Sequence, residues 1–547
     1  MTEGVSFQSY DKRKYQRQLR GWLSYAFASE VFVIVSLTLF LPICLEQFAR
    51  DNGYLLPDRT VPCSTVQPLD ASEDRRCVVK LGWLWIDTAS FSLYVNSLSV
   101  ALQALTVISM GGIADHPPHR KRILLFFAFF GAISAILFLI LSSSSPLWPL
   151  SALLAICANV GFGASVVAMN AYLPTLAQES EEVSQKREAL HSLAASRPSI
   201  DSQPRPAALE SDNVDQPLLS HHATEHVGTD DSERAKLHSE YHAVLSAATS
   251  RISSLGIALG YGAGIILLLA TLIPVTKLGG STFSLRLAIG LSGIWWGLFS
   301  LPSALWLPGS SSSEPVEECD ESITFHASGD WSMGREIINA WKRLGGMLRW
   351  REIKKLRNTF EYLAAWFLLS DGFTTITSTA VLFGKTTLHM PASSLILIGV
   401  ITPTSGIIGS LVWPMIQRRL GWSNIRVLVT LHSVKFGGLT TPGEMYALAV
   451  YFGSVYGAFQ GYARAFYSEL IPPGEEARWY GLFSITDKSS SFVGPLVVGL
   501  IADTTGNIRY AFFFLVFMVW SAVPILLSIN VEKGRKDARE YVYRGGR

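Results

Sequence analysis

The chain has 547 residues, of which 49% are hydrophobic and only 16% are charged, and its formal net charge is +2. This composition excludes an ordinary soluble protein and predicts an all-α, polytopic membrane protein. No basic run is interleaved with aromatic residues, so nucleic-acid binding is not indicated. The five cysteines are too few for a disulfide scaffold, no Cys/His spacing indicates zinc, and we expect no cofactor.

The first apolar span follows a basic N-terminus, DKRKYQRQLR, and runs for about 25 residues. It is too long for a cleavable signal core and reads as a signal anchor. The positive-inside rule then places the N-terminus in the cytoplasm and residues 50–80 across the membrane. That loop holds Cys63 and Cys77. In an oxidising lumen they would form a disulfide worth about 3 kcal/mol; otherwise they are two free thiols.

The second span, about 84–113, runs into the basic segment GGIADHPPHRKR. Asp115 at the helix end, beside Arg120 and Lys121, can form a charge lock that breaks when neighbouring helices rock apart. The segment resembles the loop signature of the major facilitator superfamily, with Pro117-Pro118 where that signature has glycine. Alternatively, the basic cluster only anchors the topology.

Spans three and four are expected near 123–141 and 150–173, so residues 1–177 form the first part of an N-terminal half. Residues 178–247 are too rich in Ser, Glu, Asp, His and Pro to bury a core, and we expect a disordered cytoplasmic loop. Within it, residues 215–220, DQPLLS, faintly resemble a dileucine sorting signal, which would make a sorting adaptor a partner. Residues 248–308 hold spans five and six.

A second cytoplasmic loop, 309–357, is acidic and then basic. Its last part places Ile337, Trp341, Leu344 and Leu348 on one face, which predicts an interfacial helix that joins two halves. Residues 358–530 then supply spans seven to twelve of a C-terminal half. Residues 531–547 form a basic cytoplasmic tail.

The seventh span, 363–383, holds Asp371 about two turns inside its start. An ionised Asp near the bilayer centre costs roughly 2.5–3.5 kcal/mol, so it must face protein or water rather than lipid. Thr374, Thr375 and Ser378 share its helix face. This polar stripe indicates either a pathway or a packing contact that Gly372 assists.

The first and seventh spans resemble one another at a shift of 341 residues. Glu30 then aligns with Asp371, and Ser29 aligns with Ser370. Two halves of six helices, related as a parallel repeat, are typical of secondary transporters with a site near the midplane. We therefore predict a 6+6 bundle of about 12 spans, similar to the major facilitator superfamily.

The ninth span departs from this pattern because only residues 425–436 are apolar between Arg419 and Glu444. That is about half the length needed to cross about 30 Å of hydrocarbon. The charges of the tail nevertheless require a crossing here, since otherwise the basic tail would lie outside. A truncated segment, such as an error in the gene model would produce, fits both facts.

Spans ten and eleven add Arg464, Asp487 and Lys488 at depths where a polar interior is needed. Gly494-Pro495 would kink the eleventh span, as the moving helices of transporters require. A static buried charge network is the alternative. The candidates for a substrate or proton pathway are Glu30, Asp371, Thr375, Arg464, Asp487 and Lys488.

The segments YAFASEVF, LPICLEQFARDNG and LLSDGFTTITSTAVLFG, with the stretch from 445 to 509, resemble the fungal autophagy-related vacuolar amino-acid effluxers. The resemblance implies a vacuolar membrane protein that exports leucine and other neutral amino acids to the cytoplasm. No phosphate loop, H-E-x-x-H or G-x-S-x-G is present, so an enzyme is not expected. The alternative is a non-transporting factor for the breakdown of autophagic bodies, or a scaffold.

Overall fold

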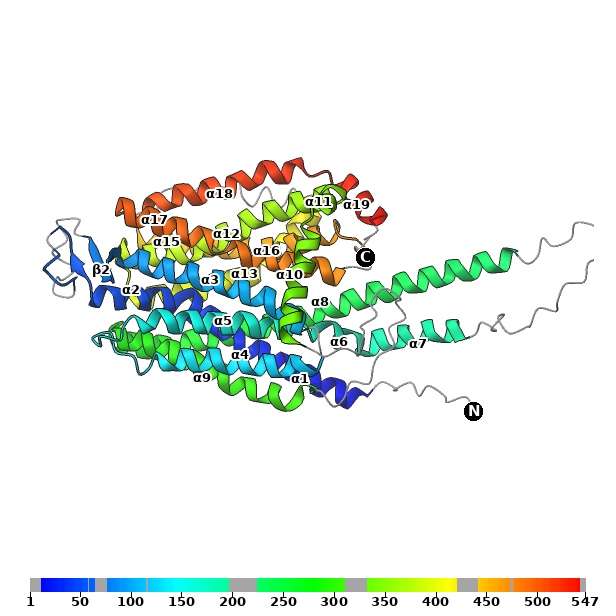
Figure 1. Ribbon diagram of the computed structural model, residues 1–547, viewed down its shortest axis with the longest axis horizontal. Coiled ribbons are helices and arrows are strands. Elements are labelled where there is room, and N and C mark those ends of the chain that lie inside the picture. Colours follow the sequence, from blue (N-terminus) through cyan, green and yellow to red (C-terminus); the bar gives the residue numbers. More distant parts are fainter. Residues whose placement is uncertain are drawn as a thin grey trace, which may run out of the picture.

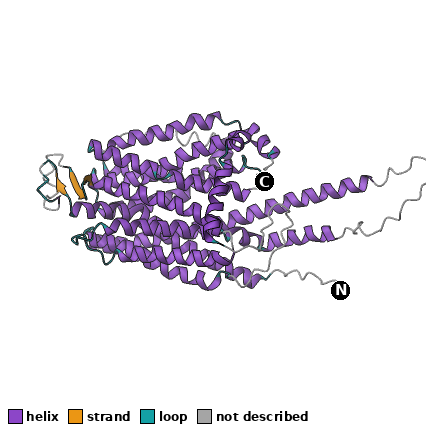
Figure 2. Cartoon of the chain, viewed as in Figure 1, coloured by secondary structure: helices purple, strands orange, loops and turns teal. Residues whose placement is uncertain are grey.

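The computed structural model describes residues 11–541, except 58, 64–75, 115–116, 196–223, 310–331, 421–440 and 473–475. Long helices lie side by side along the longest axis of the molecule, and a small sheet covers one end of the bundle (Figures 1 and 2). We call this the hairpin end. The opposite end, where α1 begins and α19 (Val531–Glu540) lies, is called the terminus end (Figure 1).

The N-terminal half begins with a continuous rod, Lys12–Asp51. It consists of α1 (Lys12–Val31), the π-helix η1 (Phe32–Phe40) and α2 (Leu41–Asp51). The other long helices of this half are α3 (Thr88–Ala114), α4 (Pro117–Leu137), α5 (Leu150–Asn170), α8 (Thr224–Lys277) and α9 (Thr282–Trp306). The sheet between α2 and α3 is antiparallel, in the order β1 (Tyr54–Leu55), β2 (Cys77–Leu81) and β3 (Leu84–Asp87).

The C-terminal half contains α12 (Arg357–Thr386), α13 (Ala392–Leu420), α15 (Pro442–Ser468), α16 (Glu476–Ser490), α17 (Val493–Thr505) and α18 (Arg509–Ser528). Eight helical segments of the described chain are long and apolar enough to cross a membrane. Helices occupy the position of every expected span except the ninth, because residues 425–436 lie outside the described residues.

Local sequence signals explain where several of these helices begin and end. The side chain of Thr441 accepts a hydrogen bond from the backbone N–H of Glu444, and the Glu444 carboxylate accepts one in return, so a capping box starts α15. Helix α17 ends at Gly506, whose φ of 74° suits glycine. The kink expected at Gly494-Pro495 takes the form of a break between α16 and α17. Pro495 then lies in the first turn of α17. A backbone N–H there would have no intrahelical acceptor, so proline is tolerated.

Two hydrophobic cores divide the molecule unevenly. The first core combines buried side chains of the N-terminal half, such as Phe32 and Trp296, with those of the hairpin-end parts of the C-terminal half, such as Leu382 and Val498. The second core contains residues from the C-terminal half and the helices that precede it, such as Trp366. Among the described residues, the buried core that the two halves share therefore lies at the hairpin end.

The segment 178–247, expected to be disordered, is partly helical. Helix α7 (Glu181–Ala195) and the first part of α8 extend beyond the bundle at the terminus end (Figure 1). They are joined by ion pairs of Lys186 with Glu240 at 2.8 Å and of Arg251 with Glu182 at 3.1 Å. Because α8 continues a membrane span, its polar extension needs no new helix nucleus, which polar composition alone does not reveal. Residues 215–220 lie outside the described residues.

The interfacial helix expected near 331–358 corresponds to α10 (Met333–Met347) and α11 (Trp350–Lys355). Helix α10 crosses the bundle at the terminus end (Figure 1). Ile338 and Trp341 are 55% and 40% exposed, as suits a helix that lies at a membrane surface. The indole N–H of Trp341 donates to the hydroxyl of Ser109 in α3 at 3.2 Å.

The sheet at the hairpin end contains the disulfide Cys63–Cys77, whose Cα atoms are 6.0 Å apart. We expect Cys63→Ser to lower the unfolding temperature, because closing a loop of this length contributes about 3 kcal/mol. Thermal unfolding of the purified protein measures the effect. Cys157→Ser, which removes a free cysteine of α5, is the matched control and should change little. Equal unfolding temperatures for both variants would contradict a stabilising disulfide.

Candidate functional site

Glu30 lies at the end of α1, near the middle of the rod, immediately before the π-helix η1. Short π-helical insertions are frequent at functional sites. The side chain is half-buried and packs against Gly260 of α8, where an added Cβ would overlap the glutamate side chain. Glycine at this position therefore leaves room for the carboxylate.

Two cations of the C-terminal half act on Glu30. Arg464 lies near the end of α15, Lys488 lies near the end of α16, and the charges of both interact with the Glu30 carboxylate. Lys488 is also 3.6 Å from Asp487, which accepts a hydrogen bond of 2.6 Å from Ser370 in α12. Glu30, Arg464, Asp487 and Lys488 are called the central charge cluster below. It joins charges of opposite sign from the two halves.

Sequence analysis missed two aromatic members of this site. Tyr261 of α8 interacts electrostatically with Glu30 and Arg464, and Tyr456 of α15 interacts with Tyr261 and Arg464. The Tyr456 hydroxyl accepts a hydrogen bond from Gln460 at 3.0 Å. A tyrosine in an apolar span is uncharged, so the sequence alone does not distinguish it as a site residue. The only available signal was the placement of Tyr456 and Gln460 two turns and one turn before Arg464 on the same helix.

Asp371 occupies a separate, buried position in α12, with 1% of its surface exposed. Its carboxylate accepts hydrogen bonds from the backbone N–H of Gly494, at 2.8 and 3.0 Å, and from Thr375 at 3.1 Å. Gly494 is the second residue of α17, so Asp371 caps the start of the helix after the break. A Cβ at Gly494 would lie 2.6 Å from the carboxylate, so only glycine permits this approach.

A buried ion pair joins the halves at the hairpin end. Lys385 of α12 contacts Glu46 of α2 at 2.6 Å, and their side chains are 17% and 1% exposed. The Lys385 ammonium also donates to the carbonyl of Ile43 and to the side chain of Gln47, both at 3.0 Å. One cation therefore holds three groups of the opposite half.

A second contact between the halves runs from the sheet to α17. Arg76, next to the disulfide, donates to the carbonyl oxygens of Ala502 and Asp503. The backbone N–H of Asp87 donates to the Asp503 carboxylate at 2.9 Å. Further along α3, Ser90 donates to the carbonyl of Gly499 at 2.9 Å. These bonds close the hairpin end between α3 and α17.

Exposure differs between the closed hairpin end and the centre. Asp487 and Lys488 are 27% and 45% exposed, and Arg464 is exposed. The Glu46–Lys385 pair and the contacts of α3 with α17 separate these groups from the hairpin end. The central charge cluster is therefore less enclosed than the contacts at the hairpin end.

The expected gating loop is visible in part. Asp115 lies outside the described residues. Arg120 stacks over the ring of Tyr172 at 5.0 Å, and the Lys121 ammonium donates to the carbonyl of Leu307 at 2.8 Å. Tyr172 and Leu307 both belong to the N-terminal half, so these two contacts lie within one half.

Comparison with known sequences gives a consistent family match. The family model described as "Vacuole effluxer Atg22 like" matches residues 14–539. "Autophagy-related protein 22" of Cryptococcus neoformans is 40% identical, covering 96% of this chain and 97% of the relative. "Autophagy-related protein 22-1" of Aspergillus fumigatus is 37% identical, covering 96% of this chain and 91% of the relative.

Comparison with solved structures identifies the fold. A nucleoside transporter matches with a TM-score of 0.50 and 11% identity, covering 94% of this chain and 99% of the other. A POT family transporter in complex with 5-aminolevulinic acid matches with a TM-score of 0.51 and 11% identity, covering 96% of each chain. The expected fold is confirmed: the chain is a helical membrane protein with the fold of major facilitator transporters.

The Glu46–Lys385 pair predicts how the hairpin end responds to the loss of its cation. Lys385→Met should open this end, because breaking a buried pair from one side costs about 3–5 kcal/mol. The measurement is the rate at which a membrane-impermeant maleimide labels Ser90→Cys. Lys277→Met, an exposed lysine at the same end, is the control. Adding Glu46→Gln to Lys385→Met should slow labelling again; a double variant as open as the single one would contradict this account.

Acidification should favour the closed hairpin end. Burial raises the pKa of Asp87 from its ordinary 3.8 to about 6, and the nearby Asp503 raises this pKa further. The N–H groups of Ala89 and Ser90 and the charge of Arg76 act in the opposite direction and lower the pKa. If Asp87 is hydrated when the halves separate, the closed state binds the proton more tightly. Protonation of Asp87 then stabilises the closed state at low pH, and this stabilisation is lost as pH rises through about 6. After correction for the smaller thiolate fraction at low pH, labelling at position 90 should therefore still be slower at pH 5 than at pH 7, and Asp87→Asn should abolish this remaining difference.

Proposed function

Because the chain belongs to the Atg22-like vacuole effluxer family, we propose that it exports leucine and other neutral amino acids from the vacuole lumen to the cytoplasm by alternating access. The family is one of transporters, and the protein is not an enzyme. The observation that carries the substrate class is the central charge cluster. A neutral amino acid is a zwitterion, so it needs one anionic and one cationic partner, and the cluster offers both.

The substrate's carboxylate would bind the guanidinium of Arg464, and its ammonium would bind Glu30 or Asp487. Charge-assisted bonds of this kind are strong and directional. The rings of Tyr261 and Tyr456 supply the less polar surface that an aliphatic side chain such as leucine's requires. Because Glu30 and Arg464 belong to different halves, a bound zwitterion would draw the halves together at the terminus end.

Asp371 and Thr375 complete the proposed pathway from a different position. The Thr375 hydroxyl donates to the Asp371 carboxylate within α12, and this carboxylate ties α12 to α17, which follows the helix that carries Asp487 and Lys488. A proton that reached Asp371 would weaken its bonds to Gly494 and so release the start of α17. This linkage supports a role for Asp371 in coupling helix movement to protonation.

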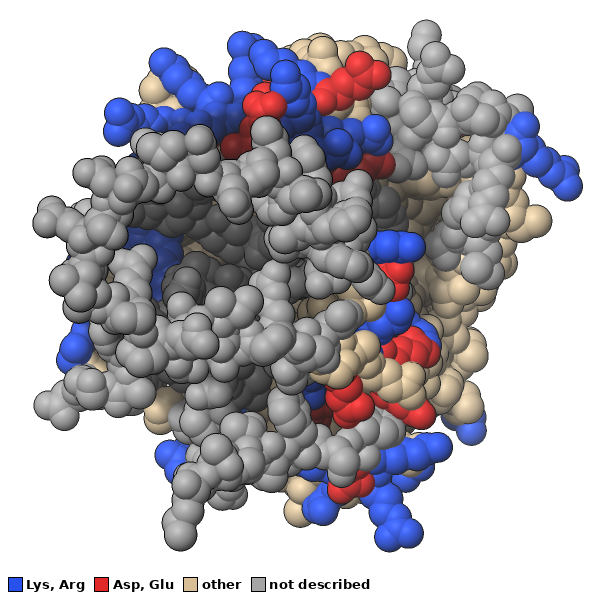
Figure 3. Space-filling view, turned by 90° about the vertical axis from the view of Figure 1, so that its right-hand side faces the viewer, with Lys and Arg blue, Asp and Glu red and all other residues tan. Residues whose placement is uncertain are grey.

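The charge distribution supports an orientation with both termini in the cytoplasm. Lys and Arg gather along the upper and lower edges of the terminus end (Figure 3). Exposed basic residues on this end include the following from α1, α10, α11 and α19: Lys12, Arg13, Lys14, Arg17, Arg20, Lys342, Arg343, Arg351, Lys354, Lys355, Lys533, Arg535, Lys536 and Arg539. The positive-inside rule assigns this end to the cytoplasm, and a disulfide suits a lumenal hairpin end. The structure would then be open towards the cytoplasm.

In this orientation the segment with Asp115, Arg120 and Lys121 is a cytoplasmic gate. When the terminus end closes, the two cations would exchange contacts such as those with Tyr172 and Leu307 for groups of the C-terminal half. Such an exchange would make the charge lock specific to the lumen-open state.

Leucine efflux from isolated vacuoles, without added ATP, tests the proposal. Vacuoles that carry the chain should release leucine faster than vacuoles that lack it, and the rate should saturate with lumenal leucine. Arg464→Gln should lower efflux at least about tenfold, because a hydrogen bond to a charged group contributes about 1.5–3 kcal/mol. Arg357→Gln, which removes an exposed surface ion pair, is the control. No difference between the two kinds of vacuole, with the protein present, would contradict a transporter.

The acids are tested by Glu30→Gln and Asp371→Asn, which keep size and shape. We expect Glu30→Gln to reduce efflux and Asp371→Asn to flatten its pH dependence, because each removes one ionisable group. Both variants are measured in the same vacuoles between pH 5 and pH 7. If efflux and its pH dependence are unchanged, neither acid belongs to the pathway.

A further inference from the structure

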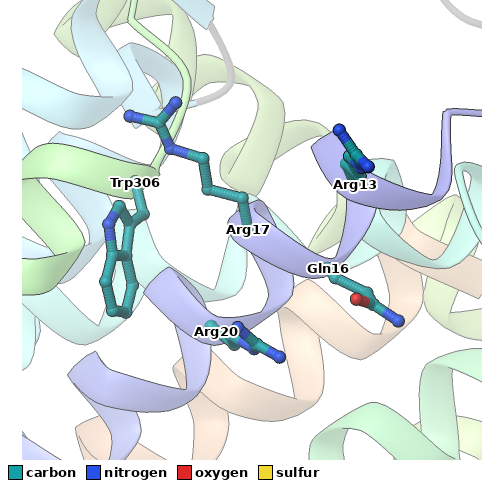
Figure 4. A pocket seen from close by; sticks show the side chains of 5 residues that line it. All are labelled: Arg13, Gln16, Arg17, Arg20 and Trp306. Atoms are coloured by element: carbon teal, nitrogen blue, oxygen red, sulfur yellow. The ribbon is translucent and has the colours of Figure 1, made fainter.

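A basic pocket lies at the terminus end, where α1 crosses the end of α9. Its volume is about 300 Å³, and it is lined by Arg13, Gln16, Arg17, Arg20 and Trp306 (Figure 4). Gly21 makes this crossing possible, because a Cβ there would lie 3.0 Å from the Cβ of Trp306. The pocket lies outside the central charge cluster and is not used by the transport mechanism.

The pocket concentrates positive charge without a compensating acid. Arg13, Arg17 and Arg20 follow one face of α1 at spacings of four and three residues. Across the described residues, none of the three forms an ion pair, and Arg17 donates only to the carbonyl of Leu305 at 3.3 Å. The charge of Arg17 also acts on Lys121. Like charges at these helical spacings disfavour one another, and an anion with several acceptor oxygens would offset this repulsion.

An exposed apolar stripe leads directly away from the pocket along α9. It consists of four side chains at spacings of four, three and four residues, with exposures of 45%, 57%, 47% and 69%: Ile294, Leu298, Leu301 and Leu305. Trp306, 38% exposed, lies between the stripe and the arginines. Tryptophan at the end of a span marks the level of the lipid headgroups. The arginines are therefore at headgroup depth and the stripe is at acyl-chain depth.

We propose that this pocket binds the phosphorylated headgroup of an anionic phospholipid, with its acyl chains along the apolar stripe of α9. A phosphomonoester is favoured over a singly charged headgroup because three arginines line the pocket. A lipid is favoured over a free phosphate compound because the stripe continues from the pocket. Bound there, the lipid would bridge α1 and α9 and fix the membrane depth of the helix that carries Glu30.

Native mass spectrometry of the purified full-length protein tests this site with phosphatidylinositol 4-phosphate as the probe. The triple variant Arg13→Gln, Arg17→Gln, Arg20→Gln should bind the lipid at least about tenfold more weakly. The matched control is Lys342→Gln, Arg343→Gln, Arg351→Gln, which removes equal charge from α10 and α11 at the same end. Its affinity should equal that of the unchanged protein. If the triple variant misfolds, Arg13→Gln and Arg20→Gln alone should each weaken binding about fivefold.

Two further binding measurements distinguish a phospholipid from a free phosphate compound as the ligand. Free inositol 1,4-bisphosphate should bind at least about tenfold more weakly than the lipid, since it cannot use the stripe. Phosphatidylserine should also bind more weakly than the phosphorylated lipid. Equal loss of binding in the two triple variants would overturn the proposal, because the attraction would then be a general property of the basic surface. Free headgroup that binds as tightly as the lipid would overturn the lipid assignment.

Discussion

Charge inside a bilayer is tolerated only where protein or water surrounds it, and this constraint governs the whole molecule. The structure meets it in two ways. Glu46 and Asp371 are buried and held by partners that stay close, namely Lys385 and the start of α17. Lys488 and Arg464 remain exposed. The first kind of charge holds elements together, and the second kind is available to a ligand.

The same division explains why the two ends of the bundle behave differently. At the hairpin end, one hydrophobic core passes between the halves, and Lys385 and Arg76 each donate to groups of the opposite half. At the terminus end, the C-terminal half has a core largely its own. A rocking motion would therefore have to exchange polar bonds and apolar packing at one end for new contacts at the other. The difference in contacts between the two ends therefore determines the free-energy barrier of the rocking motion.

Sequence reasoning could predict the fold because hydrophobic spans, loop charges and a repeat leave strong patterns. It also selected Glu30, Asp371 and Lys488 as candidates, since a charge in an apolar span is conspicuous. It could not predict the partners. Glu46 and Lys385 lie near span ends, where charges are common, and only the packing of α2 against α12 reveals that they meet. Likewise, the sequence indicated Asp371 as a candidate pathway residue. It did not indicate that Asp371 contacts Gly494, which is 123 positions away in the chain.

The π-helix η1 lies between Glu30 and Glu46 on one continuous rod. Its hydrogen bonds skip one more residue than those of an α-helix. Each residue of an α-helix turns the chain by about 100°, and a residue of the wider π-helix turns it by less, so a return of η1 to α-helical winding would rotate one end of the rod relative to the other. The winding of η1 therefore couples the two acids of the first span. A change in the winding of η1 beside Glu30 would turn the carboxylate of Glu46 away from Lys385, without bending the rod.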